Sequence, residues 1–458
     1  MSQGLTSLSA IAQRKLLADG EVSARELLAS HRERVEEVNP KINAVVAIDW
    51  EVAERSAAAV DDVIAAGGDP GPLGGLVTAH KDLLDTADFV TTYGSPLLAG
   101  DMPANDSLLV SRMKEAGAVA IGKTNTPEFG AGSHTFNPVY GVTRNPFNHD
   151  LSAGGSSGGA AAALATNMVA IADGSDAGGS LRNPAAWNNV VGFRTSPRVV
   201  PRIGTETSWS TIPIDGPMAR NVDDLNLFLN VLARPDVRDP LSRRVELDDD
   251  IQPLTRPLRV AWSPTLGGLP VEADITDTLA KLVPVMEGLG WAVTQDEPDF
   301  TGADEAFYTL RALLFASKEL PAGADQPGAV KDTVQGEVDR GKALTSAEIR
   351  SAFDISAQLW QRAGAFFASY DILIGPVTQV SPFPVELEYP SEVAGQLVGH
   401  YLEWMLSNCR ISAMALPALS LPAGFTSSGL PVGAQLIGRP WGDREVVRVA
   451  KALETALA

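Results

Sequence analysis

The sequence predicts an α/β protein in which a central twisted sheet, mixed but mostly parallel, is covered by helices on both faces. From about residue 70 to residue 230, short apolar runs typical of buried strands alternate with helical stretches, which favours strands joined through helices. In addition, 45% of the 458 residues are apolar, enough to bury a large core. No later segment looks self-contained, so we expect one large domain spanning residues 1–458.

The first part of this domain, residues 1–66, has the pattern of a helical segment that packs against the rest. Ser23 followed by Glu26 forms a capping box, the arrangement in which two side chains satisfy the free N–H groups at a helix start. We expect this helix to end at Asn39 and Pro40, because proline removes a backbone donor.

The second part, residues 70–230, is predicted to hold the core of the sheet and the reactive residues. Its expected elements, in chain order, are a strand at 76–80 leading into Lys81, a helix at 107–117, a strand at 118–122, a helix at 160–167 and a strand at 168–173.

The third part, residues 231–458, is predicted to extend the same sheet and to supply helices on the substrate side. It begins with a linker or surface loop at 234–257, which is rich in proline and charge. Strands are then expected at 258–262, 291–295, 371–377, 417–425 and 432–438, and helices at 272–289, 303–320, 346–370 and 443–457.

The composition excludes several classes of protein. Lys and Arg number 36 against 56 Asp and Glu, so the formal charge is −20, and an acidic chain offers no electrostatic attraction to nucleic acid. Cys409 is the single cysteine, which leaves no disulfide framework and no cysteine-based zinc site. The N-terminus has no basic flank before an apolar core, and no apolar run approaches about 18 residues. We expect a cytoplasmic protein with no metal, cofactor or membrane partner.

Two motif matches are misleading. Residues 117–124 fit the phosphate-loop pattern G-x-x-x-x-G-K-[ST], but the four variable positions form an apolar β run and no helix start follows. Residues 111–114 fit S-x-x-K, yet they belong to an amphipathic helical stretch and no K-T-G motif follows. We expect neither match to bind a ligand.

A more informative motif is the stretch GGSSGG at 154–159, which contains G-x-S-x-G centred on either Ser156 or Ser157. In an α/β-hydrolase a strand leads directly into this turn and a histidine follows later in the chain. The preceding residues are poor strand material, and His400 is the single histidine downstream. A flexible loop therefore remains an alternative interpretation of this stretch.

A second glycine-serine cluster, 24 residues later, favours a catalytic site. Ser180 lies in the glycine-rich stretch 174–180, beyond the carboxyl end of the strand expected at 168–173, where open α/β sheets place their sites. Glycines let backbone N–H groups converge, so the N–H groups of residues 177–180 would form an oxyanion hole for an acyl group on Ser180. A nucleophilic serine needs a base, and Lys81, at the end of an apolar strand, has the position of a buried lysine.

With these residues in view, the chain resembles the amidase signature family, from about residue 5 to the C-terminus. The segments that carry the resemblance are 74–82, 154–159 and 174–185, supported by 122–130, 216–225 and 429–440. The resemblance implies the amidase signature fold and an amidohydrolase with a Ser–cis-Ser–Lys triad. The departures are Leu151-Ser152-Ala153 before the first serine stretch and Arg198, and both would alter the substrate side rather than the triad.

The resemblance also implies a role for each site residue. Ser180 would be the nucleophile, Ser156 the bridging serine on a cis peptide after Gly155, and Lys81 the base. The other residues with implied roles are Ser157 as a hydrogen-bonding neighbour, Ala177, Gly178, Gly179 and Ser180 as the oxyanion hole, and Asp176 and Arg182 as supports of the loop.

The base imposes a physical condition on this site. Lysine accepts a proton only when it is neutral, and at an ordinary pKa near 10.4 about 0.4% would be neutral at pH 8. Burial of Lys81 would lower that pKa. Asp82 follows directly, but neighbouring side chains on a strand point to opposite faces, so we expect it not to contact Lys81.

The substrate is less well defined by the sequence. We expect a monomer or homodimer that cleaves small aryl or acyl amides or anilides, with esters and carbamates (urethanase activity) as further candidates. Gly132, Ser133 and the 375–384 loop are tentative pocket residues, and the loop is a candidate gate. The alternative is the glutaminase subunit of a tRNA-dependent amidotransferase, although a charge of −20 gives no electrostatic help with tRNA.

Overall fold

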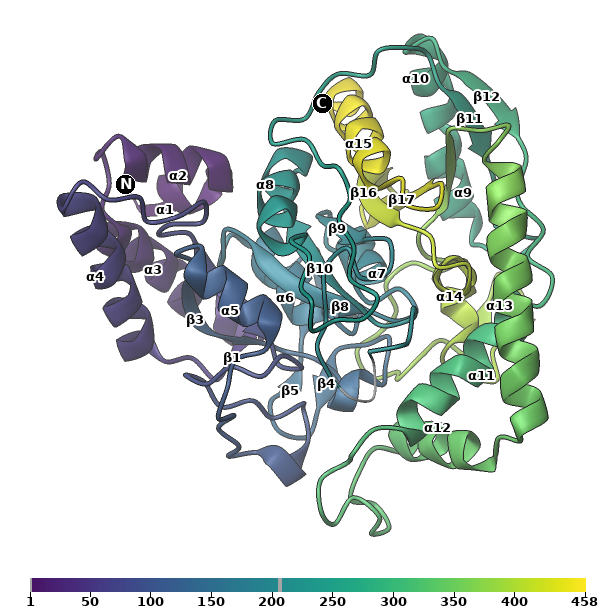
Figure 1. Cartoon of the computed structure of the whole chain (residues 1–458), viewed down its shortest axis with the longest axis horizontal. Coiled ribbons are helices and arrows are strands. Elements are labelled where there is room, and N and C mark those ends of the chain that lie inside the picture. Colours follow the sequence, from purple (N-terminus) through teal and green to yellow (C-terminus); the bar gives the residue numbers. More distant parts are fainter. Residues whose placement is uncertain (1, 205–207) are drawn as a thin grey trace.

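The computed structural model describes residues 2–204 and 208–458, and a mixed sheet runs through the middle of the molecule with helices on both sides (Figure 1). Across this eight-stranded sheet the order is β12 (Ala292–Gln295), β11 (Arg259–Trp262), β13 (Ile372–Pro376), β17 (Pro431–Gly438), β16 (Ala418–Phe425), β9 (Val191–Arg194), β10 (Ile214–Ala219) and β8 (Ala172–Asp176). The predicted class, an α/β domain with a helix-covered mixed sheet, is confirmed.

The prediction that this sheet is mostly parallel is wrong. Among the described strands, β12–β11 and β11–β13 are its two parallel pairs, and the other five pairs are antiparallel. The physical reason is the length of the connections. The chain returns from β16 to β17 through the short turn 426–430, which joins antiparallel strands, whereas a parallel neighbour requires a crossover of about a dozen residues or more.

A second, three-stranded sheet carries the predicted base. Its order is β1 (Val45–Val46), β3 (Val119–Thr124) and β2 (Val77–Lys81), and β2 and β3 are parallel, joined through helix α5 (Leu108–Glu115). This sheet meets the large one beside β8, because the Ala170 N–H donates to the Val77 carbonyl at 2.9 Å and Thr78 Oγ1 donates to the Ile171 carbonyl at 3.0 Å. Lys81, at the far end of β2, thereby lies beside Asp173 and Ser175 of β8.

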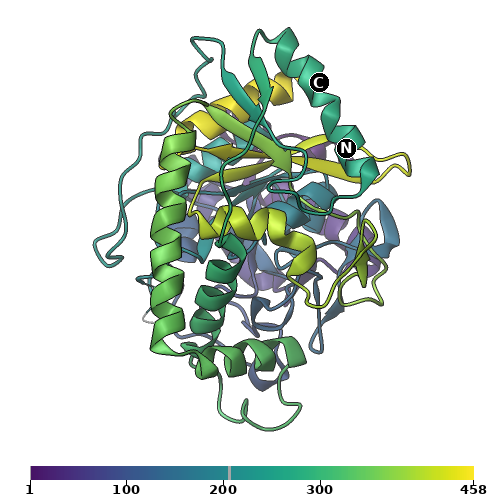
Figure 2. The same ribbon diagram turned by 90° about the vertical axis from the view of Figure 1, so that its right-hand side faces the viewer.

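The remaining elements surround these sheets. The other helices are α1 (Ser2–Ser7), α2 (Ala10–Ala18), α3 (Ala24–Ile42), α4 (Trp50–Ala65), α6 (Gly158–Ala165), α7 (Arg182–Trp187), α8 (Val222–Leu232), α9 (Ala273–Ala280), α10 (Leu282–Gly288), α11 (Ala303–Ala316), α12 (Asp332–Ala343), α13 (Ser346–Phe366), α14 (Leu406–Ala413) and α15 (Asp443–Leu457). Short paired strands are β4 (Phe136–Asn137), β5 (Gly141–Val142), β6 (Arg144–Asn145), β7 (Asn148–Ser152), β14 (Glu392–Val393) and β15 (Gln396–Leu397). Figure 2 shows α13 standing beside α11, with α12 across their ends.

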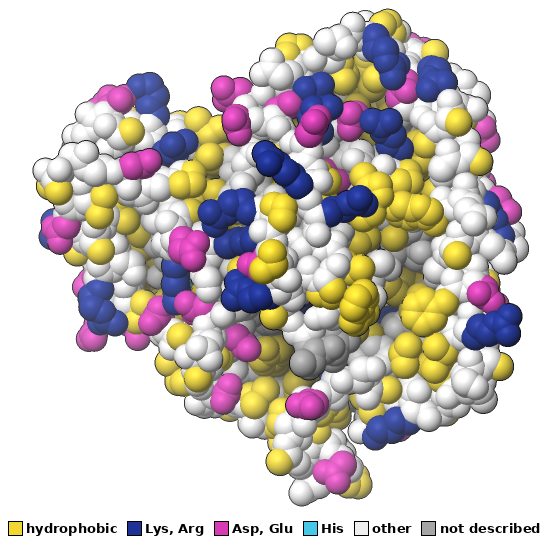
Figure 3. Space-filling model, viewed as in Figure 1, with side chains coloured by type: hydrophobic (Ala, Val, Ile, Leu, Met, Phe, Trp, Pro, Cys, Tyr) yellow, Lys and Arg dark blue, Asp and Glu magenta, His cyan; other side chains and the backbone are white. Residues whose placement is uncertain are grey.

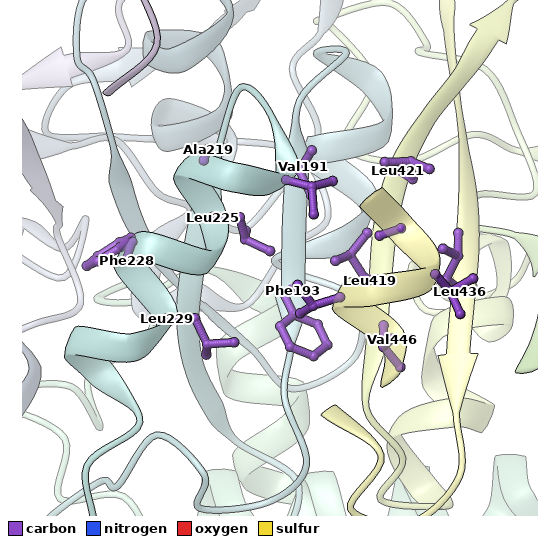
Figure 4. Packing of buried hydrophobic residues seen from close by; sticks show 14 of the residues in the cluster. Val191, Phe193, Ala219, Leu225, Phe228, Leu229, Leu419, Leu421, Leu436 and Val446 are labelled. Atoms are coloured by element: carbon purple, nitrogen blue, oxygen red, sulfur yellow. The ribbon is translucent and has the colours of Figure 1, made fainter. Parts of the chain in front are cut away.

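Both faces of the large sheet are buried. Successive strand side chains point to opposite faces, so Leu436 of β17 packs toward α8, α9 and α15 while its neighbour Ile437 packs toward α7, α11 and α14. Figure 4 shows the first of these layers, with Phe193 between Leu229 of α8 and Val446 of α15. A sheet packed on both faces holds the loops at its strand ends in defined positions.

Helix α3 begins as predicted and ends later than predicted. The Ser23–Glu26 capping box is present, but Pro40 lies inside the helix, which continues to Ile42 and stops at Asn43 in a left-handed conformation with φ of 56°. Asn39 explains this ending, because its side chain accepts from the Ala44 and Val45 N–H groups at 2.9 Å and donates to the Val45 carbonyl. These bonds close the turn despite the donor that Pro40 lacks.

Other boundaries differ as well. The strand expected at 168–173 is β8, at Ala172–Asp176, because Gly174 and Ser175 pair with Gly216 and Asp215 of β10 rather than forming a loop. The helix expected at 272–289 is divided into α9 and α10, and α12 was not expected. The residues judged poor strand material before the first serine stretch include β7, which pairs with β6.

Candidate active site

Lys81 is completely buried at the end of β2, where its side chain reaches a group of serines. Its Nζ lies 2.8 Å from both Ser156 Oγ and Ser157 Oγ, and 3.1 Å from Ser175 Oγ. Burial lowers the pKa of Lys81 to about 7, although the negative charges of Asp215, Asp176 and Asp173 act in the opposite direction. At neutral pH a large fraction of this amine is therefore unprotonated.

Asp82 faces away from the amine of Lys81, as expected from the alternation of side chains along a strand. Its carboxylate accepts from the Thr92 N–H at 3.0 Å and also from the Thr92 hydroxyl. The charge that acts on Asp82 is that of Lys123, whose Nζ donates to Leu84 O, Thr86 Oγ1 and Thr91 Oγ1. Lys123, the lysine of the phosphate-loop match at 117–124, therefore lies within β3, and its hydrogen bonds hold the loop at 84–91 in place.

A buried histidine–aspartate pair lies behind Lys81, and the sequence patterns did not predict it. Asp173 Oδ1 accepts the Lys81 backbone N–H at 2.7 Å, and Asp173 Oδ2 lies 2.6 Å from His80 Nδ1. Two features of the sequence could have indicated the pair. Asp173 is an acidic residue at the end of an otherwise apolar run, and His80 directly precedes Lys81. The pair joins β8 to β2 and so fixes the backbone from which the Lys81 side chain projects.

Ser156 and Ser180 line one cavity of about 500 Å³, together with Ser175 and Ala177. The peptide bond between Gly155 and Ser156 is cis. The side chains are almost fully enclosed, since the exposed fraction is 3% for Ser156 and 8% for Ser180. The structure therefore brings the three predicted triad residues together, with Lys81 in contact with Ser156 and Ser156 and Ser180 on the wall of the same cavity.

The loop that carries Ser180 is held by a buried ion pair. Asp176 accepts from Arg182 Nε at 3.0 Å and from Arg182 Nη2 at 2.9 Å, and Arg194 Nη1 lies 3.4 Å from the same carboxylate. The side chains of all three residues are fully enclosed. Burial alone would raise the pKa of Asp176, but the two guanidinium groups outweigh it and hold that pKa well below its ordinary value. Arg182 is further fixed by Gln435 and Ser412.

One of the four N–H groups predicted for the oxyanion hole, that of Gly179, is already used within the protein. The Gly179 N–H donates to Asp176 Oδ1 at 2.8 Å, so the structure assigns it to loop support. The N–H groups of Ala177, Gly178 and Ser180 have no acceptor among residues 2–204 and 208–458. Three of the four predicted donors are therefore available to a ligand. Gly179 has φ of 120°, and a Cβ there would lie 2.7 Å from Asn408 Cβ.

Replacement of Asp176 by Asn is expected to lower the free energy of unfolding by about 3–5 kcal/mol, because it leaves two buried guanidinium groups without a counter-charge. Thermal and denaturant unfolding of the purified variant measures this. Asp354→Asn is the control, since it breaks an exposed pair with Arg350 and should change stability by less than about 1 kcal/mol. Equal effects of the two substitutions would contradict the assigned role of Asp176.

Much of the cavity wall comes from residues that the sequence did not single out. Its apolar and aromatic part includes Tyr93, Phe129, Leu314 and Phe315, and its charged part includes Arg202, Arg311, Lys318 and Glu319. Helix α11 and the residues directly after it supply a large part of this wall, and no local motif marks them. They are recognised as site residues only once α11 is seen beside the serine loops.

The tentative pocket residues are not on this wall. Ser133 is buried and its Oγ accepts from Trp404 Nε1 at 2.8 Å, and Gly132 packs beside Pro127; the neighbouring Phe129 and Gly130 line the cavity instead. The 375–384 loop is packed in the core, with Val380 accepting a hydrogen bond from Trp187. A hydrogen bond accounts for the position of Ser133, and packing in the core accounts for that of the loop, so neither lines the cavity that holds Ser156 and Ser180. His400, the candidate histidine base, is also absent from the wall.

The comparisons with known proteins agree with this architecture. The family model named Amidase matches residues 26–447. An acylamidase of Rhodococcus erythropolis is 34% identical over 99% of this chain and 96% of its own length, and a glutamyl-tRNA(Gln) amidotransferase subunit of Carboxydothermus hydrogenoformans is 34% identical over 95% and 94%. The crystal structure of a bacterial aryl acylamidase belonging to the amidase signature enzymes superposes with a TM-score of 0.92 at 29% identity, covering 98% of this chain and 96% of that one.

The α/β fold and the family match define an amide-cleaving hydrolase. The chain belongs to the amidase signature family.

The structure shows neither a bilayer-spanning helix nor a metal-binding cluster in residues 2–204 and 208–458. No helix in this part of the chain combines the length and the apolar character needed to cross a membrane. Across the same residues, no three His, Cys, Asp or Glu side chains are grouped in a way that could hold a metal ion. On the face shown in Figure 3, basic side chains are interspersed with acidic ones.

Proposed function

We propose that the chain hydrolyses small aryl or acyl amides through an acyl-enzyme on Ser180, with Ser156 as the proton relay and Lys81 as the base. The observation that carries this proposal is the contact of 2.8 Å between the buried Lys81 Nζ and Ser156 Oγ, beside a cavity that Ser156 shares with Ser180. A desolvated amine in contact with a hydroxyl is the arrangement that a general base requires.

The first half of the reaction forms the acyl-enzyme. Neutral Lys81 takes a proton from Ser156, Ser156 takes a proton from Ser180, and the Ser180 oxygen attacks the amide carbonyl. The N–H groups of Ala177, Gly178 and Ser180 stabilise the negative charge that develops on the carbonyl oxygen. Ser156 then donates a proton to the leaving nitrogen as the C–N bond breaks, Lys81 returns its proton to Ser156, and the amine departs with Lys81 neutral again.

The second half uses the same groups with water. Water loses a proton through Ser156 to Lys81 and attacks the acyl carbonyl, and the bond to Ser180 breaks with return of the proton to its oxygen. The carboxylic acid is released and the site regains its starting protonation state. Ser157 and Ser175, both in contact with Lys81 Nζ, hold the amine in place during both halves.

The aromatic and aliphatic side chains of the cavity support an apolar or aryl group on the substrate. The similarity to an acylamidase and to an aryl acylamidase points in the same direction. A panel of a 4-nitroanilide, a primary aryl amide, an aryl ester and an aryl carbamate at equal concentration tests this proposal. We expect amides or anilides to be cleaved, and turnover of the carbamate would add urethanase activity. No turnover of any amide would overturn it.

The pH dependence of the reaction is a direct prediction. Because protonated Lys81 cannot accept a proton, kcat/KM for an anilide should fall about tenfold per pH unit below pH 7 and level off above about pH 8. A pH–rate profile between pH 4 and pH 10 measures this. Burial lowers the pKa of His400 to about 4, so a rising limb near pH 4 that disappears in His400→Ala would instead favour a histidine base.

A second candidate function is supported by the relatives named as amidotransferase subunits. In that case the chain would release ammonia from glutamine for a partner protein, with the same lysine and serines. Assay of glutaminase activity, together with affinity purification from the native organism, distinguishes the two functions. Anilide turnover by the isolated chain without glutaminase activity supports the amidase, and glutamine turnover that depends on co-purified subunits supports the amidotransferase.

The proposal takes a small-molecule amide as the binding partner, with neither nucleic acid nor membrane, and a monomer or homodimer as the working form. It also retains the cytoplasm as the site of action, supported by a cysteine content of one residue, the buried Cys409, which leaves the fold independent of internal disulfides. Size-exclusion chromatography with light scattering measures the oligomeric state.

A further inference from the structure

Arg311 of α11 is enclosed at the wall of the catalytic cavity, and its guanidinium is incompletely bonded. Its side chain is 6% exposed. Nη2 donates to the Tyr401 hydroxyl, while Nε is buried without an acceptor. The nearest carboxylate oxygen, Glu337 Oε1, lies 3.8 Å from Nε, beyond hydrogen-bond distance. Nη1 has no acceptor among the described residues, so this guanidinium has a donor left for a ligand.

The surroundings of Arg311 hold it in one orientation. Its guanidinium lies 4.6 Å from the ring centroid of Phe315 on one side and 5.6 Å from that of Tyr401 on another. Glu337, itself 2% exposed, supplies a counter-charge from α12 and lies 3.6 Å from His400. A planar donor fixed in this way is organised before the ligand arrives, which reduces the entropy lost on binding.

The charge around the cavity favours an anion. Arg202 and Lys318 line the same wall as Arg311, whereas the acids on the wall are Glu319 and Asp176, and Asp176 is already paired with Arg182. Arg202 is paired with Asp215 at 3.0 Å, and Lys318 Nζ lies 4.3 Å from the Phe315 ring centroid. With three cationic side chains against two carboxylates, the wall of this cavity carries an excess of positive charge, although the chain as a whole has a formal charge of −20.

We propose that Arg311 anchors a carboxylate of the substrate, so that the preferred amides carry a carboxylate group remote from the bond that is cleaved. This inference rests on the proposed amidase function and narrows its substrate class. A carboxylate accepts the vacant N–H of a guanidinium in a charge-assisted hydrogen bond, which is stronger than a bond to a neutral acceptor. The apolar side chains between the serines and Arg311 would contact the hydrocarbon that separates the two groups.

Matched substrate pairs test the inference. On the acyl side the pair is the 4-nitroanilide of succinic acid and that of butyric acid, and on the amine side it is 4-acetamidobenzoate and acetanilide. Wild-type protein should show a higher kcat/KM for the charged member of at least one pair, by about tenfold or more, and the pair that responds identifies the side of the scissile bond that faces Arg311.

Variants separate binding of the carboxylate from general damage. In Arg311→Gln, KM for the charged substrate should rise about 10- to 100-fold, while kcat/KM for its neutral partner stays within about threefold. Arg311→Lys should recover part of the preference, because it keeps the charge. Arg350→Gln, on α13 with a side chain 83% exposed, is the matched control and should leave both substrates unchanged. An equal loss for charged and neutral substrates would overturn the inference.

A measurement on the unaltered protein covers the possibility that Arg311→Gln does not fold. Benzoate and succinate should inhibit hydrolysis of a neutral anilide at lower concentration than benzamide and succinamide, and the difference should shrink at high salt. Equal inhibition by acids and amides contradicts the inference.

If neutral anilides are cleaved in a Ser180-dependent manner without any preference for charge, the carboxylate inference alone fails. If no amide is cleaved, the proposed function fails. Turnover of glutamine, but of no other charged amide, assigns the anchor to the amidotransferase alternative and overturns the inference for aryl and acyl amides.

Discussion

Ser180→Ala is expected to lower kcat/KM for the best anilide by about 10⁴-fold or more and to abolish covalent labelling by a fluorophosphonate. The reason is that Ser180 supplies the atom that bonds to the acyl carbon, and removal of a serine nucleophile in a hydrolase has effects of this size or larger. The substitution removes one oxygen from a residue that is 8% exposed, so the fold should be retained. Steady-state kinetics and mass spectrometry of the labelled protein measure the two effects.

The control for this experiment is Ser427→Ala. Ser427 lies on the exposed turn between β16 and β17, where its hydroxyl donates to Asp274. It should retain full activity and full labelling. Circular dichroism and thermal unfolding of both variants exclude a general loss of structure. Labelling of Ser180→Ala at the wild-type rate would mean that another residue is the nucleophile.

Lys81→Met has the second largest expected effect, a loss of about 10³-fold or more in kcat/KM at pH 8. Methionine fills a similar volume in a fully buried site but cannot accept a proton from Ser156. The rise in activity through a pKa near 7 should therefore be absent from the residual activity, because the group responsible for it is gone. Lys281→Met, an exposed substitution after α9, should retain the wild-type profile.

Lys81→Met should also change how the free energy of unfolding depends on pH. The folded-state pKa of Lys81, about 7, lies below the ordinary value of 10.5, so the unfolded chain binds more protons between these two pH values. Wild-type stability should gain from this group as pH rises from about 7 to about 10.5, and the gain should be fully lost below pH 7. The difference in unfolding free energy between wild type and Lys81→Met isolates this contribution, and a difference that does not vary with pH would contradict a depressed lysine pKa.

Most of the fold follows from local sequence patterns. Period and composition predict β2, β3, β13, β16 and β17 within a residue or two, because each is a short apolar run bounded by turn residues. The direction of the strands does not follow, since it depends on which strands become neighbours across the sheet. The strand β9, for example, lies between β16 and β10, which are separated from each other by about 200 residues of chain.

In the candidate site, too, some residues follow from local sequence motifs and others do not. Lys81, Ser156 and Ser180 are predictable because glycine and serine clusters at a fixed spacing are rare and chemically specific. Gly132 and Ser133 show the limit of this reasoning, since proximity in sequence to the site did not place them on the cavity wall. Arg311 and Phe315 could not be predicted, because they reach the cavity through the packing of α11 against α12, α13 and α14, which no local pattern encodes.

The most direct measurement of the central claim is the position of the covalent adduct. Wild-type protein labelled with a fluorophosphonate, digested and analysed by tandem mass spectrometry should carry one adduct, on Ser180, and the rate of labelling should rise with pH through a value near 7. An adduct on Ser156 or Ser157, or a labelling rate unchanged between pH 5 and pH 9, would contradict a Ser180 nucleophile activated through Ser156 by neutral Lys81.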